Sequence, residues 1–249
     1  MINLFREIWM RLACICYWQR RNARFFVILG APGSGKGTIS TLLSDETEKH
    51  DGVRLPVLVT GNLVRREIAD KTPFGVKWAP VVKSGGFIPD NEIMKLLHTE
   101  LKKPEYFNGA ILDGLPRTVG QARKLRRMLM WWGNRVNRVV LLDASDNDLL
   151  VRLEGRRTCS KKTCGKTYHT SFNPPKVEGK CNVCGSELTV RDDDKPEVVR
   201  ERQRLYKEAS RKLLHFYELN GQLTRVVTSN TRSVDEVLKD VVFTIEQFD

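Results

Sequence analysis

The stretch from Phe25 to Thr38, FFVILGAPGSGKGT, contains the residue types that bind phosphate. Its first five residues form an apolar run typical of a buried parallel strand. The glycines that follow allow a tight turn whose backbone N–H groups face a ligand. Lys36 comes next, and apolar residues at helical spacing from Ile39 onward predict a helix that begins there. A strand, a glycine loop and a helix N-terminus together predict a phosphate-binding loop, with the Lys36 charge near the terminal phosphates.

An ordinary glycine-rich turn is the alternative for this stretch, and the preceding strand and the spacing of the glycines to Lys36 disfavour it. The usual form of the motif has Ser or Thr directly after the lysine. Here Gly37 intervenes, and Thr38 follows it.

Positive charge is the second requirement for phosphate chemistry, because phosphoryl transfer depends on positioning, exclusion of water and charge stabilisation. Several arginines lie near predicted strand ends or at the edges of the cysteine-containing segment: Arg65, Arg117, Arg152, Arg156, Arg157, Arg191 and Arg202. Ligands of parallel sheets bind at the carboxyl ends of the strands. Asp113 also ends a predicted strand, where its carboxylate could hold a magnesium-bound water; a turn or capping carboxylate is the alternative.

Four cysteines form two close pairs, Cys159-x4-Cys164 and Cys181-x2-Cys184. This spacing predicts tetrahedral zinc bound by four thiolates as a closed structural site. We expect His169 to pack nearby rather than bind the metal. Two disulfides or four free thiols are the alternatives. Because Arg11 interrupts the N-terminal apolar stretch, no cleavable secretory signal is evident, and metal ligation in a reducing compartment is favoured.

The elements that must position these residues alternate along the chain. Strands are predicted at 25–29, 56–59, 110–112, 139–142 and 225–227. Helices are predicted from 36 to a polar loop at 45–54, and at 63–70, 90–102, 121–131, 149–157, 197–217 and 234–245. Alternation of this kind indicates an α/β fold, a parallel sheet with helices on both faces. Residues 158–194 break the pattern and predict an inserted subdomain. Trp131 and Trp132 close an amphipathic helix and are expected to pack in or at the edge of the core.

The composition supports a globular chain with anionic ligands. The 249 residues are 29% charged and 41% hydrophobic, and the net charge is +12. That charge favours nucleotides, nucleic acid or an anionic membrane surface as partners. No run is long enough to span a bilayer as a helix. Residues 1–24 are rich in arginine, with Glu7 the single acid. They have apolar residues at helical spacing, which indicates a targeting or membrane-associating segment; a helix packed on the domain is the alternative.

Several motifs, taken together and in this order, resemble adenylate kinase in its long-lid, zinc-binding form. They are GAPGSGKGT at 30–38, TGNLVR at 60–65, LDGLPRT at 112–118, GRR at 155–157, FNPPKVEG at 172–179 and VRDDD at 190–194. The resemblance covers residues 25–249. It implies a five-stranded P-loop NTPase-type sheet with an inserted zinc-binding lid at 158–194 and an AMP-binding segment at 60–89. It also implies reversible phosphoryl transfer from MgATP to AMP, giving two ADP, with Mg²⁺ and structural Zn²⁺ as cofactors.

The resemblance further implies roles for single residues. The ATP phosphates would contact Gly30, Ala31, Pro32, Gly33, Ser34, Gly35, Lys36, Gly37 and Thr38. Arg152 would stack on the ATP base, and Arg156 would contact the phosphates. The AMP-binding residues would be Thr60, Arg65, Gly86, Phe87, Ile88, Gly114, Arg117, Gln121, Arg191 and Arg202, with Thr60 and Gln121 reading the adenine. The catalytic residues would be Lys36, Arg117, Arg156, Arg191 and Arg202. Asp113 would belong to the outer shell of Mg²⁺. Zn²⁺ would be bound by Cys159, Cys164, Cys181 and Cys184. Asp193 resembles a carboxylate at the lid hinge.

Three positions depart from the family's pattern. Asn62 stands where the family usually has an Asp that orders magnesium-bound water, so one outer-shell charge is missing. Leu115 replaces an aromatic residue before Pro116. Ser229 and Asn230 replace a commoner Asp-Gly near the expected ATP base.

Two other functions remain open from the sequence. One is a nucleoside monophosphate kinase with another base preference, using GTP as donor or CMP/UMP as acceptor. The other is a nucleotide- or RNA-binding zinc protein, although aromatic residues do not interleave with its lysines as a stacking surface requires. We therefore expect ATP, AMP and ADP as partners, no nucleic acid, and a monomer. We expect the chain to be intracellular. Residues 1–24 are expected to direct it to mitochondria or a membrane, through contact with a membrane or with the import machinery; a cytoplasmic location is the alternative.

Overall fold

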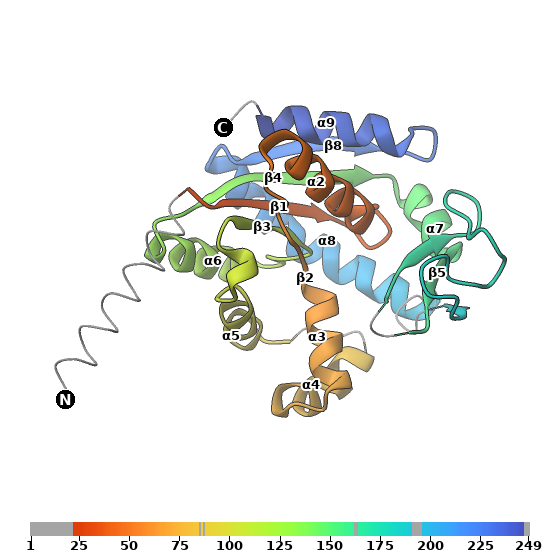
Figure 1. Cartoon of the computed structure of the whole chain (residues 1–249). Helices are drawn as coiled ribbons and strands as arrows, with labels where there is room; N and C mark the ends of the chain where they lie inside the picture. Colours follow the sequence, from red (N-terminus) through yellow and green to blue (C-terminus); the bar gives the residue numbers. More distant parts are fainter. Residues whose placement is uncertain (1–21, 85, 87, 162–163, 191–195, 247–249) are drawn as a thin grey trace.

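A computed structural model describes residues 22–84, 86, 88–161, 164–190 and 196–246; the side chains of residues 51, 196–197 and 200–202 are not described. The expected extension at 1–24 therefore lies almost wholly outside the described residues. Five parallel strands form the central sheet in the order β2-β3-β1-β4-β8 (Figure 1). They are β1 (Arg24–Gly30), β2 (Val57–Val59), β3 (Gly109–Asp113), β4 (Val136–Ala144) and β8 (Leu223–Thr228). The expected five-stranded parallel sheet is confirmed.

Helices cover both faces of this sheet (Figure 1). They are α2 (Lys36–Asp51), α3 (Thr60–Ala69), α4 (Pro73–Lys83), α5 (Asp90–Glu100), α6 (Val119–Trp131), α7 (Asp146–Glu154), α8 (Pro196–Leu219) and α9 (Val234–Glu246), with a 3-10 turn at Pro104–Tyr106. Successive residues of β1 point to opposite faces. Phe25 and Val27 enter the core under α5, α6 and α8, whereas Phe26 and Ile28 enter the core under α2 and α9. An apolar run buried on both faces is what the sequence predicted for this strand.

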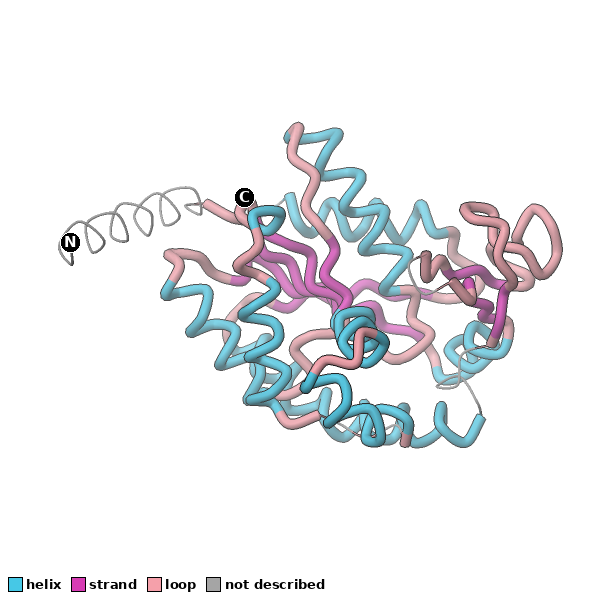
Figure 2. Tube along the Cα trace, turned by 60° about the horizontal axis from the view of Figure 1, so that its bottom comes forward, coloured by secondary structure: helices cyan, strands magenta, loops and turns pink. Residues whose placement is uncertain are grey.

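A second, three-stranded antiparallel sheet lies apart from the central one (Figure 2). Its strands are β5 (Arg156–Cys159), β6 (Thr167–His169) and β7 (Leu188–Thr189). Its small core contains Cys159, Tyr168 and Cys181. The expected helix at 149–157 is therefore wrong at its end: α7 stops at Glu154, and Arg156 and Arg157 lie on strand β5.

Helix α2 differs from expectation because it continues through the polar stretch to Asp51. Two of its polar side chains are buried and bonded. Ser44 Oγ donates to the Leu55 carbonyl at 2.5 Å, and Thr47 Oγ1 accepts from the Leu55 N–H at 3.1 Å. Buried hydroxyls with partners cost little. The polar residues therefore fasten the helix to the start of β2 instead of ending it.

Helix α4 was not expected from the sequence. Pro73 begins it, and the Thr72 hydroxyl caps it by accepting from the Gly75 N–H at 3.1 Å. A side chain at Gly75 would collide with the Glu67 carbonyl of α3, so the two helices cross at backbone contact. The Thr72 hydroxyl also donates to Glu67 Oε2 at 2.7 Å. Helices α3 and α4 thus form one closely joined pair.

An ion cluster fastens this pair to the rest of the domain. Arg66 Nη2 of α3 lies 2.7 Å from Glu100 Oε2 of α5, and Lys103 Nζ lies 2.8 Å from the same oxygen. Glu100 is buried, whereas the two basic side chains are partly exposed. Two hydrogen bonds to its charged form offset the cost of burying that carboxylate.

Two further observations concern the surface. Trp131 is 83% exposed, so the expectation that it packs in or beside the core is wrong; Trp132 is half-buried and stacks on His98. Among the described residues, no helix combines the length and apolar character needed to cross a membrane.

Candidate functional site

The phosphate-binding loop lies between β1 and α2, as the sequence predicted. Gly35 adopts φ 89° at the N-cap of α2, a conformation that side chains disfavour. Gly33, at φ 90°, is packed so closely that a Cβ there would lie 2.9 Å from Leu153 Cγ of α7. The Lys36 ammonium donates to the carbonyls of Gly30, at 2.7 Å, and Ala31, at 2.8 Å. The positive charge is thus held over the loop.

The register of the sheet brings the other candidate groups to the same edge. Asp113 of β3 pairs with Ile28 of β1 and with Val59 of β2, and Thr60 begins α3 directly after β2. Asp113 is buried, and a Cβ at Gly37 would lie 3.7 Å from its Oδ2. The carboxylate therefore faces the first turn of α2, beside the phosphate-binding loop. This position suits a group that orders magnesium-bound water.

Arg152 of α7 joins three parts of this edge. Its Nε donates to Asn230 Oδ1 at 2.8 Å, and its Nη1 donates to Thr228 Oγ1 at 3.3 Å and to the Ser34 carbonyl at 3.5 Å. Burial lowers the pKa of this guanidinium. The Asn230 N–H in turn donates to Asp148 Oδ1 at 3.2 Å. Arg152 is therefore fixed between the glycine loop and the segment after β8. Asn230 joins this segment to α7 through Arg152 and Asp148, a role that the sequence did not suggest.

Gln121 of α6 is buried and held by partners at both ends of its amide. Its Nε2 donates to Asp90 Oδ1 at 2.9 Å, and its Oε1 accepts from the Arg117 N–H at 2.7 Å. Asp90 also accepts from the Thr118 hydroxyl at 2.6 Å. These bonds fix which end of the amide carries oxygen. The sequence analysis missed Asp90; its place directly after Pro89, at the start of a helix, was the available signal.

The Thr60 hydroxyl is buried without a hydrogen-bond partner among the described residues. Such a group costs free energy in a folded protein. Unpartnered polar atoms are typical of places where a ligand completes the bonding.

Two of the candidate arginines follow their strands, as expected. Arg65 Nη2 donates to Asn62 Oδ1 at 2.6 Å, and Arg117 Nε donates to the Gly114 carbonyl at 3.0 Å. Arg156 instead lies on β5, opposite His169. Gly86 donates to the Val81 carbonyl, and Ile88 is buried. Phe87, Arg191 and Asp193 and the side chain of Arg202 lie outside the description.

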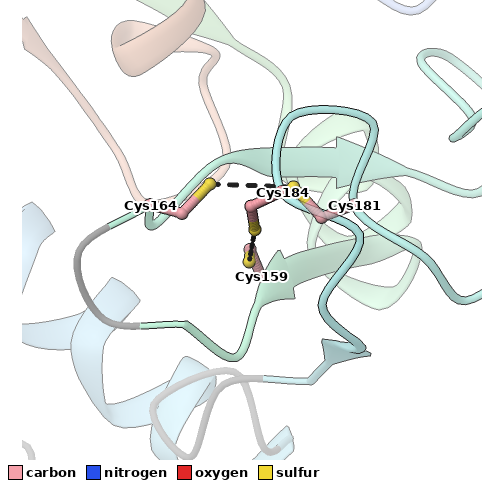
Figure 3. A group of neighbouring side chains, drawn as sticks. All are labelled: Cys159, Cys164, Cys181 and Cys184. Atoms are coloured by element: carbon pink, nitrogen blue, oxygen red, sulfur yellow. Dashed lines mark hydrogen bonds between the residues drawn. The ribbon is translucent and has the colours of Figure 1, made fainter.

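The four cysteines come together from two separate stretches of the chain, one with Cys159 and Cys164 and the other with Cys181 and Cys184 (Figure 3). All four sulfur atoms lie within 4.8 Å of one another. Cys159 Sγ is 3.4 Å from Cys184 Sγ, and Cys164 Sγ is 3.7 Å from Cys181 Sγ. Four thiolates at the tetrahedral Zn–S distance of about 2.3 Å would be separated by about 3.8 Å. No disulfide joins these four, and the residue set and spacing fit zinc.

Neighbouring groups lower the pKa of two of the thiols, Cys181 and Cys184, whereas the pKa values of Cys159 and Cys164 are raised. The pKa of the Cys181 thiol is lowered to about 6, chiefly by the Tyr168 hydroxyl, which lies 3.4 Å from its Sγ, and further by the backbone N–H groups of Cys184 and Val183. His169 points away from the cluster: its ring contacts Phe172, and its Nε2 lies 3.3 Å from the Val151 carbonyl. The expectation that His169 packs rather than binds metal agrees with this position.

Comparisons with known proteins bear on this geometry. The family model described as adenylate kinase matches residues 28–222, which include the phosphate-binding loop, Gln121 and the four cysteines. The chain is 37% identical over 220 residues to the adenylate kinase of Geotalea uraniireducens, covering 88% of this chain and 97% of that protein. It is 38% identical to those of Clostridium novyi, over 88% and 97%, and Thermodesulfovibrio yellowstonii, over 89% and 98% of the two chains.

The chain belongs to the adenylate kinase family. It is therefore a phosphotransferase. The resemblance read from the motifs is confirmed.

Proposed function

We propose that this chain transfers the γ-phosphoryl group of MgATP to AMP, giving two ADP, and that AMP is its preferred acceptor. The observation that carries the proposal is the shared edge of the sheet. The phosphate-binding loop, Asp113 and Thr60 all lie at the carboxyl ends of β1, β3 and β2. A donor phosphate and an acceptor placed at that edge would lie close enough to react.

In this reaction the loop from Gly30 to Thr38 would bind the ATP phosphates. Binding requires Lys36 to leave the carbonyls that it now contacts and to turn its charge to the phosphate oxygens. Magnesium, when bound with ATP, supplies charge that neutralises the phosphates, and Asp113 would hold it through water. Arg152 would lie against the ATP base. Asn62 cannot add the negative charge that an Asp would, so Asp113 would carry that task.

On the acceptor side, Arg65 and Arg117 would bind the AMP phosphate, with Arg191 and Arg202 closing over the transferred group together with Arg156. Gln121 and Thr60 would read the adenine. Because Asp90 and Arg117 fix the direction of the Gln121 amide, the site presents one pattern of donor and acceptor. A base with another pattern leaves buried groups unpaired and is penalised. Gly86, Phe87, Ile88 and Gly114 would line the pocket.

A coupled assay with ATP tests the acceptor. We expect the highest kcat/KM with AMP, compared with GMP, CMP and UMP, and ATP preferred over GTP as donor. Equal or better use of CMP or UMP would contradict the adenine-reading roles. Binding of RNA without any phosphoryl transfer would instead favour the nucleotide- or RNA-binding zinc protein.

The variant Lys36→Met tests the phosphate-binding loop. Loss of a charge that acts on the transition state is expected to lower kcat by about a thousandfold or more. Lys49→Met is the matched control, because Lys49 lies on the same helix and is exposed. Both variants should keep the circular dichroism and the Tm of the parent. Near-parental turnover of Lys36→Met would contradict the proposal.

We further propose that Cys159, Cys164, Cys181 and Cys184 bind one structural Zn²⁺, that residues 158–194 act as a lid and 60–89 as the AMP-binding segment, and that residues 1–24 determine location. The distances between the four sulfurs support zinc. For location, a reporter carrying residues 1–24 is expected at mitochondria or a membrane. A uniform cytoplasmic signal would contradict it.

A further inference from the structure

The outward face of α6 combines several arginines with two large apolar side chains. Exposed residues recur at helical spacing, while Ala122, Leu125 and Leu129 on the opposite side are buried. We define the α6 face by its exposed residues Arg123, Arg126, Arg127, Met130 and Trp131, with Arg135 just beyond the helix. Trp131 is 83% exposed and Met130 61%. These two neighbouring apolar side chains would lose exposed surface if a partner covered this face.

The stretch of chain that contains α6 carries charge of a single sign. Between Asp113 and Asp143 the chain contains no acidic residue and seven basic ones. Other arginines form ion pairs, such as Arg66 with Glu100. Among the described residues, the four arginines of the α6 face form none. A face that combines unneutralised positive charge with exposed Trp and Met fits an anionic, partly apolar partner.

A polar hollow of about 490 Å³ adjoins the end of α6. It is lined by Asn22, Ala23, Arg24, Gly133, Asn134, Arg135 and Asn137, so its polar side chains include two arginines and no carboxylate. The chain enters here: the Ala23 N–H donates to Asn134 Oδ1 at 3.1 Å. Residues 1–21 therefore connect to the rest of the chain beside the α6 face, and their sequence adds four arginines and only one acid.

We propose that the α6 face binds the surface of an anionic lipid bilayer. Trp131 and Met130 enter the headgroup layer, and Arg123, Arg126, Arg127 and Arg135 contact lipid phosphates. A single large aromatic beside a flexible methionine suits this layer better than nucleic acid, which needs aromatic residues spaced along a strand.

The arrangement is compatible with catalysis. The end of α6 leads into the start of β4, at the amino edge of the sheet, whereas the nucleotide site lies at the carboxyl edge. Figure 1 shows α6 and the small sheet with β5 at opposite sides of the molecule. A chain bound to a bilayer through the α6 face keeps its nucleotide site toward the solution.

Co-sedimentation of the full chain with vesicles tests the proposal. Two vesicle types are used, phosphatidylcholine alone and phosphatidylcholine mixed with phosphatidylserine. We expect binding only to the second, weakened at high sodium chloride concentration. Each arginine at an anionic surface contributes about fivefold, so Arg126→Gln with Arg127→Gln should weaken binding about 25-fold. Trp131→Ser should weaken vesicle binding at low and at high sodium chloride concentration, because the contribution of the indole is not electrostatic.

The matched control is Lys166→Gln with Lys176→Gln, which removes the same charge from exposed positions of the lid. Its binding is expected to stay within about twofold of the parent, since the lid lies away from the bilayer. Arg126 and Arg127 lie outside the nucleotide site, so the α6 double variant should keep parental turnover. Parental vesicle binding by the α6 variants would overturn the proposal and assign binding to residues 1–24. Equal loss in the lid control, no binding to either vesicle, or binding of RNA in place of vesicles would overturn it as well.

Discussion

Replacing Thr60 by Val should make the nucleotide-free chain more stable and AMP binding weaker. Thr60 is 6% exposed, and its Oγ1 is buried without a hydrogen-bond partner in the described part of the chain. A buried hydroxyl without a partner costs about 1–3 kcal/mol. Val has nearly the same shape and no polar atom. At the lower end of that range, the gain is about 1 kcal/mol, which raises the Tm of a chain of this size by roughly 2–4 °C.

The effect on AMP has the opposite sign. If the Thr60 hydroxyl bonds the bound adenine, its loss removes one neutral hydrogen bond, worth about 0.5–1.5 kcal/mol. The KM for AMP should then rise by about twofold to tenfold, with the KM for ATP unchanged. Thermal unfolding without nucleotide and steady-state kinetics with varied AMP measure the two effects.

Thr60→Ser is the matched control for this pair of measurements. It keeps the hydroxyl and loses one buried methyl, so it should lower stability by about 1 kcal/mol and keep the KM for AMP. A lower Tm for Thr60→Val, or an unchanged KM for AMP in that variant, would refute the reasoning.

Two further predictions concern the ion cluster and the lid. Glu100→Gln should lower stability at neutral pH by about 1 kcal/mol, a figure discounted because Arg66 and Lys103 are partly exposed. Burial raises the pKa of Glu100, but hydrogen bonds from Arg66 and Lys103 outweigh it, and the net shift is downward from 4.5. The stabilisation is therefore present above that value and lost as the pH falls below it, so unfolding curves of parent and variant should converge in acid; a constant difference would count against it. Cys181→Ser with Cys184→Ser should remove the zinc found by metal analysis and lower the Tm, with part of the activity kept at low temperature. Loss of zinc without any change in Tm would show that the metal does not hold the lid.

The sequence predicted the central sheet because its signals are local. Apolar runs such as Phe25–Leu29 are bounded by glycine or polar residues, and each run became a strand. Helix α4 could not be found in this way, since Gly75 and Pro80 are weak helix formers. Gly75 is needed because the backbone of α3 passes against it, a contact that the local sequence does not contain.

The candidate site divides along the same line. The phosphate-binding loop and the cysteine pairs are short motifs, and the spacing of their residues is enough to predict their arrangement. The bond between Gln121 and Asp90 joins residues 31 positions apart, and it depends on how α6 packs on α5. Trp131 was misjudged because helical spacing shows which residues share a face, whereas burial depends on what lies opposite.

The close crossing at Gly75 has a mechanical consequence. Because α3 and α4 touch through their backbones and share the Thr72 and Glu67 hydrogen bonds, neither helix can bend independently of the other. An acceptor that binds at Thr60, as proposed above, would then move the two helices together. The Arg66–Glu100 ion pair, near the carboxyl end of α3, would hold that end of the pair in place. Substitutions of Arg66 or Glu100 should therefore change the rate at which the acceptor binds, although neither residue is proposed to contact the nucleotide.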